Sequence, residues 1–184
     1  MTLRLVTVVG SLRQGSYNRM IAQTLPELAP SGVEIVAAPS IAGIPLYDSD
    51  LQAKGIPLQV TALGEAIQAA DGVIIVTPEY NYSVPGVLKN AIDWLSRLSP
   101  QPLAGKPLAI QSASMGVMGG VRAQYHLRQT LIFLEALVLN KPEVMVGAAQ
   151  NKVDIETGRL NDEPTRQFIA GQLEAFAAFI RKMS

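Results

Sequence analysis

Apolar residues along the chain fall into two alternating kinds of segment, which predict alternating strands and helices. Short runs of apolar and β-branched residues have the length and composition of buried β-strands. These runs span residues 3–9, 33–37, 72–77, 108–113 and, more briefly, 136–139. Between and after them, apolar residues recur every three or four positions, as they do on one face of an amphipathic helix. The helical faces are marked by Ile21 and Leu25, by Val60, Leu63 and Ile67, by Leu88 and Ala91, by Leu127 and Leu131, and by Ile169, Leu173 and Phe176.

The strand segments predict a sheet that is covered on both faces. Residues 72–77, with the sequence Gly-Val-Ile-Ile-Val-Thr, are apolar almost throughout, as in a parallel strand packed between helices. Strand–helix alternation with short connections leaves few topologies. We therefore predict an α/β fold of three layers, flavodoxin-like, with a five-stranded parallel sheet in the order 2-1-3-4-5. Ligands bind such sheets beyond the carboxyl ends of the strands, where the winding direction switches, so the loops that begin at Gly10 and Pro78 lie at the predicted site.

Composition narrows the class of protein. A chain of 184 residues is long enough for one core and short for two, which predicts a single domain over residues 1–184. Fifteen basic and fifteen acidic residues give no net charge, which argues against nucleic acid or an anionic membrane as partner. The absence of cysteine excludes disulfides and thiolate chemistry. We expect no signal peptide and no membrane span, and hence a cytoplasmic protein.

The first candidate loop, residues 10–19, has the sequence Gly-Ser-Leu-Arg-Gln-Gly-Ser-Tyr-Asn-Arg. Its spacing differs from the dinucleotide-binding fingerprint, and no Gly-Lys-Ser/Thr follows as in a Walker loop. It offers the hydroxyls of Ser11 and Ser16, the amide of Asn18, the guanidinium of Arg13 and the N-terminus of a helix. This set suits a terminal phosphate group. The alternative is that Ser16 or Asn18 only caps the helix and that the arginines are solvated.

Two further loops follow the third and fourth predicted strands. Residues 78–86, with the sequence Pro-Glu-Tyr-Asn-Tyr-Ser-Val-Pro-Gly, combine stiffening prolines with two tyrosines, which suits the edge or face of a flat ring. Residues 112–120 contain three glycines, which permit close approach of the backbone to a ligand. The alternatives are a rigid turn that covers the sheet end and an ordinary flexible turn.

Residues 10–19, 77–97 and 114–120 together resemble the NADPH-dependent FMN reductase family of the flavodoxin-like fold, and within it the bacterial chromate and quinone reductases. The resemblance extends from the first strand to about Lys152. It implies bound FMN as cofactor, NAD(P)H as co-substrate, and ping-pong hydride transfer to quinones, with chromate or similar oxidants as further acceptors. Because the flavin carries this chemistry, we expect no catalytic side chain and no metal.

The resemblance also implies a role for each motif residue. The FMN phosphate falls to Ser11, Arg13, Ser16 and Asn18, with Tyr17 nearby. The flavin ring and its ribityl chain fall to Pro78, Glu79, Tyr80 and Asn81, and the pyrimidine side of the ring to Ser114 and Gly116. For Glu79 we favour a hydrogen-bonded carboxylate that anchors its loop, because a negative charge beside a reduced flavin would resist reduction.

Relatives of this family form dimers and tetramers, which implies a homo-oligomer, with a homotetramer as one form. The side chains expected to form a polar network across its interface are Tyr82, Arg122, Tyr125 and Glu143.

Two other functions remain open from the sequence. One is a flavodoxin-type electron carrier, although such carriers usually dock through a strongly acidic surface and this chain has no net charge. The other is an oligomeric interaction protein that binds FMN weakly, against which Arg13 argues. Steady NAD(P)H consumption with a quinone separates the enzyme from both.

Overall fold

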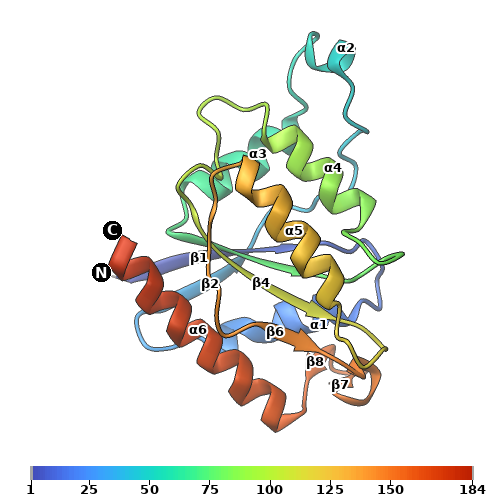
Figure 1. Cartoon of the computed structure of the whole chain (residues 1–184), viewed down its shortest axis with the longest axis vertical. Coiled ribbons are helices and arrows are strands. Elements are labelled where there is room, and N and C mark those ends of the chain that lie inside the picture. The colour runs from blue at the N-terminus through green and yellow to red at the C-terminus, as the bar shows by residue number, and fades with distance from the viewer. Residues whose placement is uncertain (1, 184) are drawn as a thin grey trace.

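The structure, a computed structural model, describes residues 2–183. A parallel sheet lies between two layers of helices (Figure 1), with strand order β2-β1-β3-β4-β5. The α/β class and the order of the strands are therefore as predicted. The strands of this path are β1 (Leu3–Val9), β2 (Val33–Ala37), β3 (Gly72–Thr77), β4 (Pro107–Ala113) and β5 (Leu137–Val138).

The prediction of five strands is corrected to six, because two short strands share the fifth position. β5 pairs with the start of β4, and β6 (Val144–Val146) pairs with its end. Pro142 lies in the interruption between them, and a proline has no N–H to donate to a ladder. A small antiparallel pair, β7 (Val153–Asp154) and β8 (Arg159–Leu160), follows and was not predicted. Strands of two residues are too short to show a period.

Helices cover both faces of the sheet (Figure 1). Along β1, Leu5 belongs to the core cluster under one layer and Val6 to the core cluster under the other. None of the helices within residues 2–183 is both long and apolar enough to cross a membrane. One layer holds α1 (Tyr17–Thr24), its 3-10 extension η1 (Leu25–Leu28) and α6 (Glu163–Met183). The other layer holds α3 (Leu58–Gln68), α4 (Gly86–Leu95) and α5 (Val121–Phe133). Two short helices lie in connections, α2 (Ser49–Gln52) and η2 (Ala149–Asn151).

The last helix, α6, packs along the sheet through the face that the sequence predicted. Ile169, Leu173 and Phe176 are all fully buried. A Cβ atom at Gly72, the first residue of β3, would lie 2.9 Å from Cζ of Phe176. Glycine at this position therefore lets α6 approach the central strand closely.

A carboxylate caps the start of α6. Asp162 accepts hydrogen bonds from the backbone N–H and the hydroxyl of Thr165, and the hydroxyl bond is the larger cause that lowers the pKa of Asp162 from its ordinary value of 3.8. A carboxyl with a lowered pKa in the folded state stabilises the fold above its unfolded pKa. That contribution is lost as the pH falls through the folded pKa.

We predict that Asp162→Ala lowers the free energy of unfolding at pH 7 by about 0.5–2 kcal/mol, the usual value of such a cap. The difference from the parent should shrink as the pH falls below the ordinary pKa, as measured by urea unfolding at several pH values. Asp162→Asn is the matched control, because its amide oxygen still caps the helix but does not titrate. If the parent and Asp162→Asn show the same dependence of stability on pH, the carboxylate is not its source.

Candidate functional site

Three loops meet at the carboxyl edge of the sheet because β1, β3 and β4 are neighbours. The first two are held together at Gly10, whose N–H donates to the carbonyl of Val76 (2.9 Å). A Cβ atom at Gly10 would lie 2.6 Å from Oγ1 of Thr77 and 3.0 Å from Cδ2 of Leu88. Any larger residue would therefore push the first loop away from the second.

The first loop forms a cradle for an anion. Ser11 and Ser16 are buried, with exposed fractions of 3% and 4%. The Ser11 hydroxyl accepts from the N–H of Arg13, and the Ser16 hydroxyl accepts from the N–H of Arg19 (both 3.4 Å). In these contacts each hydroxyl is the acceptor, so its own proton remains to donate to a ligand. The first turn of α1 carries no acidic residue, so its partial positive charge is not neutralised locally.

Arg13 and Tyr17 lie at the mouth of this cradle. The exposed Arg13 guanidinium lies 5.6 Å from the centroid of the Tyr17 ring. A contact with the face of a ring occupies no guanidinium N–H group. The donors of Arg13 therefore remain available to a ligand beside the two hydroxyls.

Asn18 has a role that neither interpretation of the sequence included. Its Nδ2 donates to the carbonyl of Ala113, and its Oδ1 accepts from the N–H of the same residue (both 2.9 Å). The two bonds tie the start of α1 to the end of β4. These bonds use only one of the two N–H groups on Nδ2 of Asn18. A contact between the other N–H and a phosphate stays a prediction.

Glu79 anchors the second loop to α5. Its Oε2 accepts from the N–H groups of Arg122 (2.9 Å) and Ala123 (3.1 Å), at the first turn of that helix. Its Oε1 lies 3.5 Å from the Arg122 guanidinium. The anchoring role that we favoured for this carboxylate is confirmed.

The second loop contains a tight turn with a left-handed backbone. Tyr80 and Ser83 exchange backbone hydrogen bonds in both directions (3.1 and 3.0 Å). The residues between them, Asn81 and Tyr82, have φ values of 48° and 67°, as in a type I′ turn. For a tyrosine this conformation costs about 1–2 kcal/mol. The Arg122 guanidinium lies 3.9 Å from the Tyr82 ring centroid and braces the turn, which leaves the half-exposed Tyr80 ring at the site.

The single histidine contacts the turn, whereas the single tryptophan has its contacts elsewhere. His126 on α5 has its Nδ1 3.0 Å from the hydroxyl of Ser83. Its ring thus contacts the second loop from α5. Trp94 on α4 is fully buried and donates from Nε1 to the carbonyl of Pro45 (2.9 Å), which is a packing role.

The third loop is held by its glycines and by a buried serine. Ser112 donates from its hydroxyl to the carbonyl of Gly119 (2.6 Å). Gly119 has a φ of 59°, and a Cβ atom there would lie 2.6 Å from the carbonyl carbon of Met145. Ser114 donates to the carbonyl of Gly116 (3.1 Å), so both predicted residues lie within the same turn at the sheet edge.

An apolar rim borders the third loop. Met115, Val117 and Met118 have exposed fractions of 61%, 89% and 52%. Exposed apolar side chains that gather in this way indicate a surface for an apolar ligand or partner. Sequence reasoning missed them, because isolated apolar residues in a loop show no period. It named Arg122 only for an interface network and missed its contacts with Glu79 and Tyr82 within the chain, which join segments about 40 residues apart.

Comparisons with known proteins agree with this arrangement. A sequence model of the family described as NADPH-dependent FMN reductase matches residues 3–151. The chain is 62% identical over 182 residues to a quinone reductase from Escherichia coli (strain K12), covering 98% of this chain and 97% of that one. It is 51% identical over 181 residues to an NAD(P)H-dependent FMN reductase from Pseudomonas aeruginosa, with the same coverage. Among solved structures, the flavoenzyme NAD(P)H:(acceptor) oxidoreductase FerB from Paracoccus denitrificans matches with a TM-score of 0.86 and 35% identity, over 98% of both chains.

Proposed function

The chain belongs to the NADPH-dependent FMN reductase family, and from this we propose that it reduces quinones with NAD(P)H in a ping-pong cycle. It is an oxidoreductase with FMN as cofactor and NAD(P)H as co-substrate. One observation supports quinones as substrates: the anion cradle and the exposed apolar rim lie at the same edge of the sheet. The chain also aligns along its length with a quinone reductase.

The residues of the first loop fit the phosphate of FMN. Ser11 and Ser16 are buried and still have protons to donate, Arg13 supplies a cation, and α1 directs its N-terminus at the same place. Tyr17 stacks on Arg13 and keeps the guanidinium near the cradle. The remaining N–H of Asn18 adds a donor to this set.

The residues of the other two loops fit the ring system. Glu79 holds the second loop, which begins at Pro78, against α5, and the turn presents Tyr80 and Asn81 at the sheet edge. Backbone groups near Ser114 and Gly116 border the opposite side. When bound, FMN supplies the chemistry, taking a hydride from NAD(P)H and passing two electrons to the acceptor.

The apolar rim supports quinones as the acceptors. A quinone is flat and largely apolar, and Met115, Val117 and Met118 expose apolar surface beside the edge where the ring is expected. One open face has to serve both substrates in turn, which is the reason for a ping-pong cycle. Chromate offers no apolar surface to the rim, and we place it with other oxidants as a secondary acceptor.

The first experiment is to purify the protein with FMN, record its visible spectrum and measure NADH and NADPH consumption with benzoquinone. We expect the absorption of oxidised flavin, about one NAD(P)H consumed per benzoquinone, and parallel double-reciprocal plots at several quinone concentrations. An electron carrier or an interaction protein would not consume NAD(P)H at a steady rate. A protein that stays colourless with added FMN would rule out the proposed function.

A further prediction concerns the phosphate cradle. Arg13→Ala should weaken FMN binding by about 1.5–3 kcal/mol, or roughly 10- to 150-fold, since a charge-assisted hydrogen bond is lost. The fold should remain intact because Arg13 is exposed in a loop. Fluorescence titration of the apoprotein with FMN measures the change, and Arg181→Ala, an exposed arginine on α6, is the control. Equal FMN affinity in the parent and Arg13→Ala would remove Arg13 from the site.

We propose also that the chain forms a homo-oligomer, a dimer or a tetramer. The end of α5 exposes Ile132 and Phe133, with exposed fractions of 75% and 87%. The four side chains that we expect at the interface form two contacts within a single chain. The Arg122 guanidinium lies over the Tyr82 ring, and the Tyr125 hydroxyl donates to Glu143. Light scattering should give a multiple of the chain's 19.7 kDa, and a mass of one chain at micromolar concentration would contradict the proposal.

A further inference from the structure

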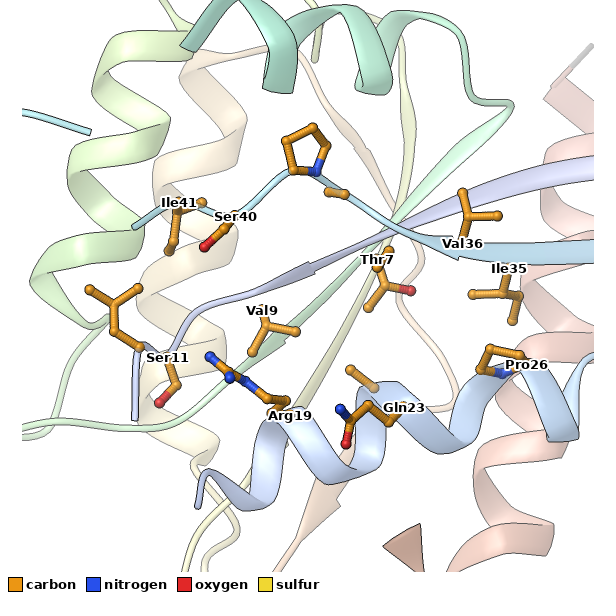
Figure 2. A pocket seen from close by; sticks show the side chains of 15 residues that line it. Thr7, Val9, Ser11, Arg19, Gln23, Pro26, Ile35, Val36, Ser40 and Ile41 are labelled. Carbon is orange, nitrogen blue, oxygen red and sulfur yellow. The ribbon is translucent and has the colours of Figure 1, made fainter. Parts of the chain in front are cut away.

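A pocket opens between α1 and the outer strand β2, beside the first loop but away from the other two (Figure 2). Its volume is about 360 Å³, near the lower end of the range for small-molecule sites. Of the residues assigned to FMN, only Ser11 lines it. Its walls include Thr7 and Val9 from β1, Arg19 from α1, and Ile35, Ala37 and Ile41 from β2 and the segment after it.

Thr7 places a buried hydroxyl without a partner in this pocket. Its exposed fraction is 5%, and its Oγ1 has no hydrogen-bond partner among residues 2–183. The other buried threonines are satisfied: Thr24 donates to the carbonyl of Met20, Thr77 to that of Pro78, and Thr165 to Asp162. Buried polar groups are nearly always paired, so an exception calls for an explanation. Four other buried side-chain atoms among residues 2–183 also lack a partner, but none of their residues lines this pocket. The Thr7 hydroxyl is therefore available to a ligand in the pocket.

Arg19 adds a positive charge that the protein does not neutralise. Arg19 lines the pocket, and its guanidinium extends from α1 toward Ser11 in the view of Figure 2. No carboxylate of residues 2–183 pairs with it. Glu27, which follows on η1, pairs instead with Arg159 and Arg166 (3.4 and 3.1 Å). None of the described residues that line the pocket is acidic. The pocket therefore combines one cation with walls that are otherwise mostly apolar.

We propose that this pocket is a second ligand site and that it takes a small aromatic carboxylate. The planar fork of an arginine matches a carboxylate and binds it through two hydrogen bonds. The apolar walls, among them Val9 and Ile35, suit the ring, and the Thr7 hydroxyl suits a polar substituent on it. A free phosphate would leave these walls without contact. Ser11 belongs both to this pocket and to the FMN cradle, so the occupant lies against the loop that holds the cofactor.

The test uses the FMN-loaded protein with methyl-labelled isoleucine, leucine and valine, titrated with sodium benzoate and observed by NMR. We expect saturable shifts of the methyl groups of Val9, Ile35 and Ile41, with a Kd on the order of 1 mM for a ligand this small. Benzamide has the same shape without the charge and should bind at least about ten-fold more weakly.

Three variants locate the site. Arg19→Gln should weaken benzoate binding about ten-fold or more, because the charge-assisted bonds are lost. Ala37→Leu narrows the pocket from an exposed position and should also weaken benzoate binding. Thr7→Val keeps the shape and removes the hydroxyl, so it should leave benzoate affinity unchanged and weaken only the binding of a hydroxybenzoate, whose ring hydroxyl is the substituent that Thr7 would meet. Arg181→Gln removes the same charge from the exposed end of α6 and should leave the affinity unchanged. If Thr7→Val does not fold, Arg19→Gln and Ala37→Leu still decide the matter.

Several results would overturn the proposal. One is the absence of saturation with benzoate, and another is an unchanged benzoate affinity in Arg19→Gln. Shifts confined to Val84 and Val117 would place benzoate at the flavin edge instead. A loss of FMN affinity in Arg19→Gln with benzoate binding intact would assign the arginine to the cofactor. Because benzoate binding is measured directly, failure of this site leaves the proposed reductase activity untouched.

Discussion

The close contact between β1 and β3 at Gly10 is the constraint on which the site depends. With no Cβ between them, the first loop turns directly over the side chain of Thr77 and meets the second loop. The backbone bond from Gly10 to Val76 fixes the register of this contact. The start of α1, with its unneutralised positive end, is thereby placed beside the loop in which Tyr80 lies.

Two ties then join the remaining loop to the first two. Asn18 uses both ends of its amide on Ala113 and links the first loop to β4. Glu79 links the second loop to α5, which begins directly after the third. Both residues stand in motifs that resemble ligand-binding segments, yet their visible contacts are with the protein itself, chiefly with its backbone. Their main contribution is to hold three loops in one geometry, which a cofactor enzyme needs because the cofactor carries the reaction.

The helix α1 faces two different ligand environments. Its N-terminus, with Ser16 as cap, is directed at the cradle that we assign to phosphate. Its side, through Arg19, is directed at the pocket next to β2. We thus propose different roles for the two arginines of the same loop motif, with Arg13 at the mouth of the cradle and Arg19 at the wall of the pocket. A ligand in the pocket next to β2 would therefore lie close to FMN without occupying the FMN site.

The sequence by itself determined the class of fold and the edge of the sheet at which the three candidate loops lie. Residues 3–9, 33–37 and 72–77 are strands as predicted. The physical reason is clearest for residues 72–77, which are buried throughout, because a strand that is buried on both faces needs a continuous apolar run. The loops after them had to lie at one edge, since parallel strands all end there, and the anchoring role of Glu79 followed from the chemistry of the flavin.

Other features were decided by pairings between distant segments, and no local pattern records such pairings. Asn18 and Ala113 are 95 residues apart, and the split of the fifth strand depends on where each piece meets β4. Along the sequence, Thr7 is an ordinary strand threonine and Arg19 an ordinary helix arginine. Only the packing of α1 against β1 and β2 leaves the hydroxyl of the one and the charge of the other without partners in a common pocket.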